Sequence, residues 1–308
     1  MDSFYRNLYR VYFIFSQSIA EGVFRRWPGT GRGFVRLKRL AQRHFLPKAH
    51  AWVRIQSGLS QGLWMQICVF GEAGLWRGEH EPEVQNAILA VVRPGAVIYD
   101  VGAHVGTMAL GAAQLVGDLG RVVAFEGDPE NVERLRANSV RNGLEGRLQV
   151  VHAAVWSRTA SDGLSFRRGT TARSQGGIEA DGNHPVLAKG EIIKVPAITL
   201  DDFVAAGGLP PRMVKIDVEG GEYEVLRGAT TLLATQRPLI IAEVHHHRAA
   251  EQITTWLNEN RYEAQWNIPE EKFPRRLFAW PTEQDGDAWM RDVLFGSSRQ
   301  KKVLESGS

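Results

Sequence analysis

"YDVGAHVGTMAL" at residues 99–110 contains a strand, a turn and the start of a helix in twelve residues. An apolar run ends at Asp100, the chain turns through Gly102 and Gly106, and small apolar residues at helical spacing follow. In α/β proteins a glycine turn between a strand and a helix lets the backbone approach a bound nucleotide closely. The stretch therefore predicts a nucleotide-type ligand at this turn, with a ligand-free tight turn as the alternative.

Short apolar runs alternate with helical patterns along the rest of the chain. The runs are "AVIYDV" (96–101), "RVVAFE" (121–126), "LQVVHAAV" (148–155), "MVKIDV" (213–218) and "PLIIAEV" (238–244), and the predicted helices between them are 107–116, 129–142 and 221–234. These runs show little period-two polarity, which is typical of strands that are covered on both faces. The alternation predicts an α/β fold with a doubly wound, mostly parallel sheet. Residues 157–190, rich in Gly, Ser, Thr and Arg, are predicted to be a long loop.

Acidic residues end four of the five runs: Asp100, Glu126, Asp217 and Glu243. A dinucleotide fingerprint would need glycine at 102, 104 and 107, but the chain has His104 and Thr107, which disfavours a bound pyrophosphate. Glu126 lies at the end of the next strand, where an acid accepts hydrogen bonds from ribose hydroxyls. The turn and this acid together favour a nucleoside without phosphates, which indicates S-adenosyl-L-methionine.

Four segments, in this order and spacing, resemble the FkbM family of S-adenosylmethionine-dependent methyltransferases, within the class I Rossmann-like methyltransferases. They are "EPEVQ…VRPGAVIYDVGAHVGTMAL", "GRVVAFEGDPENVERLRAN", "VKIDVEGGEYEVLRGA" and "LIIAEVH". The resemblance covers roughly residues 60–250 and implies that Asp100, Gly102, Ala103 and Gly106 form the cofactor loop, with Glu126 on the ribose. It also implies methylation of hydroxyl oxygens of sugars, polyketides and similar molecules. The family usually has Asn at His104 and Pro at Gly127, so His104 is expected to alter cofactor contacts or to reach the substrate.

Methyl transfer to a hydroxyl requires the protein to position the acceptor and to take its proton. Asp217, Glu243 and His245 are the predicted catalytic residues, and Asp217, His104 and Glu81 join the predicted cofactor site. Asp217 and Glu243 would also hold a hard divalent cation such as magnesium, if one is used.

Each of these assignments has a structural alternative. Asp217 could cap the helix that starts near Gly221, Glu81 could cap its own helix, and Glu219 and Glu222 could be first-turn acids. Of His245, His246 and His247, at most the first and third can converge, because consecutive residues of a strand alternate between faces. The arginines of "RRGTTARSQGG" (167–177) and "FPRR" (273–276) are either solvated loop charges or contacts for an anionic acceptor.

Charge is concentrated at the N-terminus. Residues 1–50 hold ten Lys or Arg against two acids, a net +8, whereas the whole chain of 308 residues has a net charge of +3. We predict a basic, mostly helical N-terminal extension (1–60), a Rossmann-like methyltransferase domain (61–295) and a flexible tail (296–308). The extension is expected to pack on the body or on a second copy, to contact a membrane surface, or to bind a polyanionic partner. With a single cysteine and no evident cleavable signal peptide, a cytoplasmic location is expected, with peripheral membrane contact as a variant.

The sequence thus predicts an S-adenosylmethionine-dependent methyltransferase that acts on a hydroxyl of a sugar, glycan or other small-molecule natural product. One alternative is an N-methyltransferase acting on protein or RNA. It is disfavoured because "IDVEG" stands where an Asn-Pro-Pro-Tyr-type amine-binding motif would be, and because the chain has no specific nucleic-acid motif. The other alternative is a non-catalytic membrane-surface protein with a methyltransferase fold.

Overall fold

The computed structural model describes residues 50–68, 72–168, 177–178, 190–269 and 272–283. All of them belong to one compact unit, His50–Ser308. The predicted basic helix near the N-terminus and the predicted tail from 296 lie outside the described residues.

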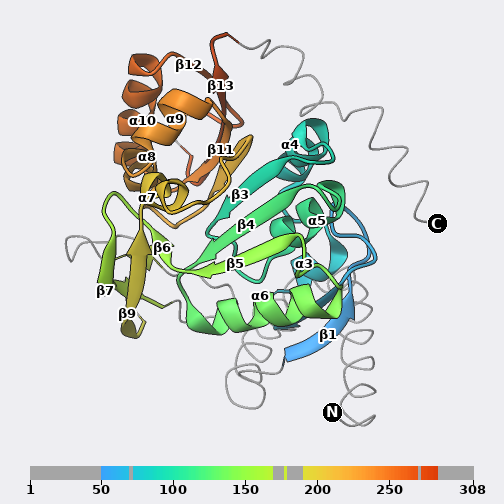
Figure 1. The fold of residues 1–308 in the computed structure, drawn as a ribbon. Helices are drawn as coiled ribbons and strands as arrows, with labels where there is room; N and C mark the ends of the chain where they lie inside the picture. Colours follow the sequence, from blue (N-terminus) through green and yellow to red (C-terminus); the bar gives the residue numbers. More distant parts are fainter. Residues whose placement is uncertain (1–49, 69–71, 169–176, 179–189, 270–271, 284–308) are drawn as a thin grey trace, which may run out of the picture. The chain divides into compact units, whose positions relative to one another are not determined.

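A seven-stranded sheet forms the centre of this unit (Figure 1). Its strands, in spatial order, are β12 (Tyr262–Trp266), β13 (Arg275–Pro281), β11 (Leu239–Val244), β10 (Met213–Ile216), β3 (Val97–Val101), β4 (Arg121–Glu126) and β5 (Leu148–His152). The five strands from β11 to β5 are parallel, whereas β13 runs antiparallel to both of its neighbours. The predicted doubly wound, mostly parallel sheet is confirmed.

Helices cover both faces of this sheet, so alternate strand residues face different cores. Ile98 faces one core, whereas Tyr99 and Val101 face the other. The first core includes α4 (Pro82–Val91), α5 (Thr107–Leu115) and α6 (Pro129–Arg141). The second includes α7 (Leu200–Ala205), α8 (Glu222–Arg227), α9 (Thr230–Gln236) and α10 (His247–Glu259). Burial on both faces explains the continuous apolar runs of the parallel strands.

The strand order reverses between β3 and β10. From β3 the chain proceeds outward to β4 and β5, and then returns to form β10 and β11 on the other side. In open α/β sheets the ligand crevice lies beyond the carboxyl ends of the strands at such a reversal. The acids at the ends of β3, β4, β10 and β11 are therefore brought to one edge.

Two smaller sheets correct the sequence-based picture. Residues 157–190 are not simply a long loop, because they contain β7 (Ala160–Arg167) and β8 (Gly177–Ile178), which join β6 (Ala154–Val155) and β9 (Ile192–Ile198) in a four-stranded sheet. The predicted domain boundary at residue 60 stays a prediction, but β1 (His50–Arg54) already pairs with β2 (Trp64–Cys68). A short helix, α3 (Ala73–Arg77), follows β2.

The helix predicted over 221–234 is divided into α8 and α9 at Gly228. Another segment approaches closely at this position, since a Cβ on Gly228 would lie 2.1 Å from the carbonyl oxygen of Trp156. The chain after β6 therefore crosses against the end of α8, and this crossing brings Trp156 toward the carboxyl edge of the sheet.

Candidate active site

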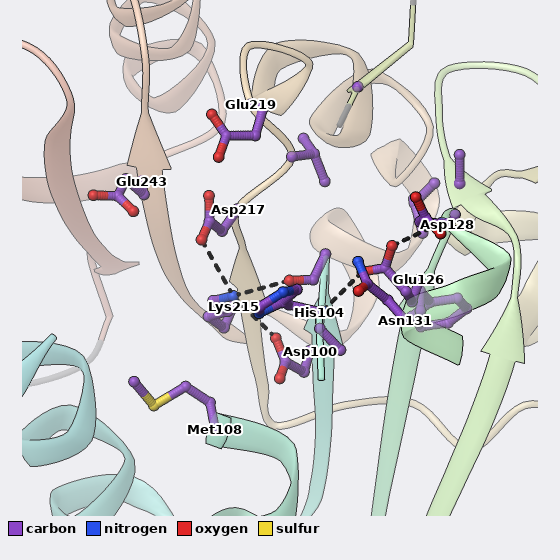
Figure 2. A pocket seen from close by; sticks show the side chains of 18 of the residues that line it. Asp100, His104, Met108, Glu126, Asp128, Asn131, Lys215, Asp217, Glu219 and Glu243 are labelled. Atoms are coloured by element: carbon purple, nitrogen blue, oxygen red, sulfur yellow. Dashed lines mark hydrogen bonds and ion pairs between the residues drawn. The ribbon is translucent and has the colours of Figure 1, made fainter. Parts of the chain in front are cut away.

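A cavity of about 510 Å³ lies at the carboxyl ends of the central strands. Figure 2 shows Asp217, Glu219 and Glu243 at one end of it, and Glu126 and Asp128 at the other. The predicted residues that line it are Glu81, Asp100, Gly102, Ala103, His104, Glu126, Asp217, Glu243 and His245. The structure thus brings together almost all of the residues selected from the sequence.

The turn after β3 needs glycine at two positions for different reasons. Gly102 has a φ of 77°, and a Cβ there would lie 1.8 Å from the carbonyl oxygen of Asp217. Gly106 has a φ of 94°, and its Cβ would lie 2.1 Å from a methyl group of Leu135. Gly102 therefore allows contact between the loop and the end of β10. Gly106 faces α6 and, unlike the other predicted loop residues, does not line the cavity.

Glu126 holds this loop in place. Its Oε2 accepts a hydrogen bond from the backbone N–H of His104 at 2.8 Å, and its Oε1 accepts one from the N–H of Asp128, also at 2.8 Å. Burial raises the pKa of Glu126, and the two N–H donors oppose this shift. A carboxylate has about four lone-pair sites, so acceptor capacity remains on the side that faces the cavity.

The His104 side chain does not extend toward Asp217 or Glu243. Its Nε2 lies 3.4 Å from Oε1 of Glu72, a residue that also binds Arg134 of α6. Burial opposes the charge on Glu72, but His104 and Arg134 outweigh it and lower its pKa to about 2. The backbone of His104 is left-handed, with a φ of 53°, a conformation in which Asn and His are both enriched. The departure from the family's Asn therefore preserves the turn.

Lys215 provides the positive charge at the centre of the site. Its Nζ lies 3.2 Å from Oδ1 of Asp100 and 3.7 Å from Oδ2 of Asp217, and it donates to the carbonyl of Gly102 at 3.3 Å. Burial opposes this charge, but the surrounding carboxylates, including Glu81, raise the pKa of Lys215. Asp100 is 3% exposed, and its Oδ2 accepts no hydrogen bond from any described residue.

His245 follows β11 and is buried among three carboxylates. Its Nδ1 lies 2.8 Å from Glu222, and its Nε2 lies 3.2 Å from Glu219 and 3.8 Å from Asp217. Glu219 has a left-handed φ of 55°, and such strain at a loop is common at functional sites. Burial raises the pKa of Glu219 to about 7. Glu222 is a first-turn acid of α8, as one alternative expected, but its carboxylate turns back to the histidine.

Arg276 of β13 joins the acids on the other side of the site. Its guanidinium lies 3.1 Å from Glu243, 3.5 Å from Glu81 and 3.5 Å from Glu83. Burial, together with the charges of Asp217 and Glu81, raises the pKa of Glu243 to about 8 despite this partner. The prediction that the arginines of "FPRR" lie in a loop is wrong for Arg276, because the residue lies in a strand and is paired with carboxylates rather than being a solvated loop charge.

The capping alternatives for Asp217 and Glu81 are not supported. Helix α8 begins after Gly221 without a side-chain cap, so Asp217 does not cap it. Glu81 precedes α4 but makes no capping hydrogen bond, and its side chain is directed to Arg276 instead.

The adjacent histidines do not form a cluster. His246 caps α10 by accepting the N–H of Ala249, and the ring of His247 packs on Phe273. Only His245 of the three lines the cavity.

Within the described part of the chain, every helix is too short or too polar to cross a membrane.

A family model and two relatives place the chain in one family. The methyltransferase FkbM domain matches residues 100–264. The hexuronic acid methyltransferase AglP of Haloferax volcanii is 31% identical over 180 residues, which cover 58% of this chain and 68% of that protein. The 31-O-demethyl-FK506 methyltransferase FkbM of Streptomyces tacrolimicus is 31% identical over 175 residues, 50% of this chain and 67% of that protein. A crystal structure of methyltransferase FkbM from Methylobacillus flagellatus aligns with a TM-score of 0.42 and 17% identity, covering 68% of this chain and 57% of that one.

Proposed function

Because this chain belongs to the FkbM methyltransferase family and is an S-adenosylmethionine-dependent methyltransferase, we propose that it methylates a hydroxyl oxygen of a sugar, a glycan or another small-molecule natural product. The two curated relatives, one named for a hexuronic acid and one for a natural product, support this class of acceptor. The observation that carries the proposal is the set of buried and half-buried acids at the carboxyl ends of β3, β4, β10 and β11, around one cavity.

The cavity fits the cofactor. When bound, S-adenosylmethionine supplies an electrophilic methyl group on a sulfonium. Glu126 would accept hydrogen bonds from the ribose hydroxyls. At Gly102 and Ala103 the backbone would come close to the ligand. The buried Oδ2 of Asp100 has no described hydrogen-bond donor, so Asp100 and Glu81 would face the ammonium group at the amino-acid end of the ligand.

Asp217 and Glu243 are our proposed acceptors of the hydroxyl proton. In the transfer, the acceptor oxygen would bond to the methyl carbon as the carbon–sulfur bond breaks with its electron pair left on sulfur, and one of these carboxylates would take the hydroxyl proton. Burial and the neighbouring acids raise the pKa of Glu243 to about 8, which suits a base near neutral pH. We assign His245 the role of a protonated neighbour that stabilises Asp217.

The same carboxylates would be the ligands of a divalent cation. Ligand atoms of Asp217, Glu243 and His245 lie within 4.8 Å of one another, and the two carboxylates would hold the cation because a protonated His245 has no free nitrogen lone pair. Carboxylate oxygens are the ligands that Mg²⁺ prefers. Dialysis against EDTA should then reduce turnover and added Mg²⁺ should restore it. Turnover that is unchanged by EDTA assigns both carboxylates to proton transfer alone.

Two measurements test the proposed function. Titration calorimetry with S-adenosylhomocysteine should show binding, and absence of binding at millimolar ligand contradicts the proposed cofactor site. Labelled S-adenosylmethionine incubated with a fractionated cell extract should then label glycans or small molecules. Label in RNA or protein instead would favour the N-methyltransferase alternative. An Asp217→Asn variant should lose turnover, and a variant that keeps both full turnover and its affinity for S-adenosylhomocysteine would remove Asp217 from the mechanism.

The roles of the basic residues 1–50 and the cytoplasmic location are further proposals. We propose contact with a membrane surface or with a second copy of the chain, because residues 4–19 combine six aromatic residues with Arg6 and Arg10. Co-sedimentation with anionic liposomes and light scattering, each with and without residues 1–48, distinguish these two contacts.

A further inference from the structure

The two ends of the cavity differ in chemistry. The end around Asp217 is charged, whereas the end beyond Glu126 is bounded by side chains of the four-stranded sheet. Phe166 of β7 and Ile178 of β8 line this end and are 6% and 8% exposed. A ligand with one flat apolar part and one charged part therefore has only one favourable orientation here.

Gly127 lies between Glu126 and this apolar wall. A Cβ on Gly127 would lie 3.0 Å from Cε2 of Phe166 and 3.3 Å from Cδ2, closer than the 3.5–4.0 Å at which carbon atoms are in favourable contact. The ring of Phe166 thus occupies the space into which a side chain at 127 would project. This accounts for the absence of the proline that the related family usually has there.

The strand that presents Phe166 is fixed on both sides. Phe166 is paired with Ile193 of β9 and with Ile178 of β8. Two residues later, Arg168 donates to Asp128 at 2.8 and 3.1 Å and to Glu130 at 2.9 Å. These bonds join the end of β7 to the start of α6, directly beside Gly127, so the ring is held in place before a ligand binds.

We propose that Phe166 is the aromatic wall against which the purine base of the cofactor stacks, and that residue 127 is glycine so that this ring can reach the base. The inference rests on the proposed cofactor site, because Glu126 holds the ribose next to this wall. Bases stack on aromatic side chains through their flat faces. Asn131, which lines the same end (Figure 2), offers both a donor and an acceptor to the edge of the base.

Calorimetry with two ligands tests the position of the ring. S-adenosylhomocysteine fills both ends of the cavity, whereas 5′-methylthioadenosine lacks the amino-acid part. Phe166→Ala should weaken the binding of both ligands about ten-fold or more. Phe166→Tyr should retain most of the affinity. Glu81→Gln, at the charged end, should weaken the binding of S-adenosylhomocysteine and leave the affinity for 5′-methylthioadenosine unchanged.

A double-mutant cycle tests the role of Gly127. Gly127→Ala should weaken binding in the wild-type background and have little effect when Phe166 is already alanine, because the clash is then gone. Gly146→Ala is the matched control, since a Cβ there meets nothing within 4 Å. Thermal unfolding identifies variants that fail to fold, and Phe166→Leu, which keeps apolar volume without a ring, then replaces Phe166→Ala.

These measurements distinguish a failure of the inference about Phe166 from a failure of the proposed function. If the wild-type protein binds S-adenosylhomocysteine and folded Phe166→Ala (or Phe166→Leu) binds it equally well, the inference is overturned while the proposed function stands. Additive effects of Gly127→Ala and Phe166→Ala also overturn the link between the two residues. If the wild-type protein does not bind the ligand, the proposed function fails and the inference fails with it.

Discussion

Glu222 and His245 form a buried pair in which Oε1 of the glutamate lies 2.8 Å from Nδ1 of the histidine, with side chains 0% and 8% exposed. The same oxygen accepts the backbone N–H of Gly220 at 2.7 Å. The pair therefore orients the ring so that Nε2 is directed to Asp217 and Glu219. Burial opposes a charge on His245, but Glu222, followed by the other two carboxylates, raises its pKa to about 10.

Glu222→Gln should lower the pKa of His245, which a titration of the imidazole ¹⁵N signals would measure. Because the pKa in the folded protein lies above the ordinary 6.5, this histidine contributes stability that is complete below pH 6.5 and is lost as the pH rises toward 10. Thermal unfolding of the variant should therefore depend less on pH in this interval. Glu224→Gln on the same helix is the control. Identical pH profiles of wild type and Glu222→Gln would contradict the role of the pair.

Glu126→Gln should weaken the binding of S-adenosylhomocysteine by about 1–3 kcal/mol. The reason is that a charged group, which would accept hydrogen bonds from two ribose hydroxyls, becomes a neutral amide. The amide oxygen can keep only part of the bonds to the N–H groups of His104 and Asp128. Calorimetry measures the affinity, and thermal unfolding shows whether the loop is preserved. Glu133→Gln, an exposed residue of α6, should leave the affinity unchanged. Unchanged affinity in Glu126→Gln would remove Glu126 from the ribose site.

Glu72 should govern part of the acid stability. Its pKa is lowered from 4.5 to about 2, so the stability it contributes is present above pH 4.5 and is lost as the pH falls toward 2. Glu72→Gln leaves Arg134 buried without its charge partner and should cost about 3–5 kcal/mol at neutral pH. Denaturant unfolding between pH 2 and 7 measures both effects. Asp118→Asn, which breaks an exposed ion pair with Arg147, should cost no more than about 1 kcal/mol.

The acids of the site could be predicted from the sequence because parallel strands end at a common edge. Asp100, Glu126, Asp217 and Glu243 each end an apolar run, so the order of the runs was enough to bring them together. The glycine turn was equally readable, since Gly102 has a conformation and a close approach that no other residue allows.

The partners of these acids could not be predicted in the same way. Arg276 reaches Glu243 because β13 runs antiparallel to β11 and places the two residues in register. The alternation of apolar runs and helices predicts parallel strands and does not indicate an antiparallel strand such as β13. Glu222 required knowledge of where its side chain turns within α8. Phe166 lies in "ASDGLSFR", and the Asp, Gly and Ser residues of this segment favour a loop. In the structure the segment pairs with β9 and forms a strand with an irregular register.

Gly102→Ala should abolish binding of S-adenosylhomocysteine and destabilise the fold. Two costs add at this position. A left-handed φ of 77° costs about 1–2 kcal/mol for a residue with a side chain. The added Cβ would also lie 1.8 Å from the carbonyl oxygen of Asp217, so the loop and the end of β10 must separate.

Gly95→Ala separates these two costs. Gly95 has a φ of 85°, but a Cβ there meets nothing within 4 Å, so only the conformational cost applies. Gly102→Ala should therefore lose roughly 1–3 kcal/mol more in the free energy of unfolding than Gly95→Ala, and only Gly102→Ala should lose ligand binding. Equal destabilisation with retained binding would mean that the contact between the cofactor loop and Asp217 does not hold the site together.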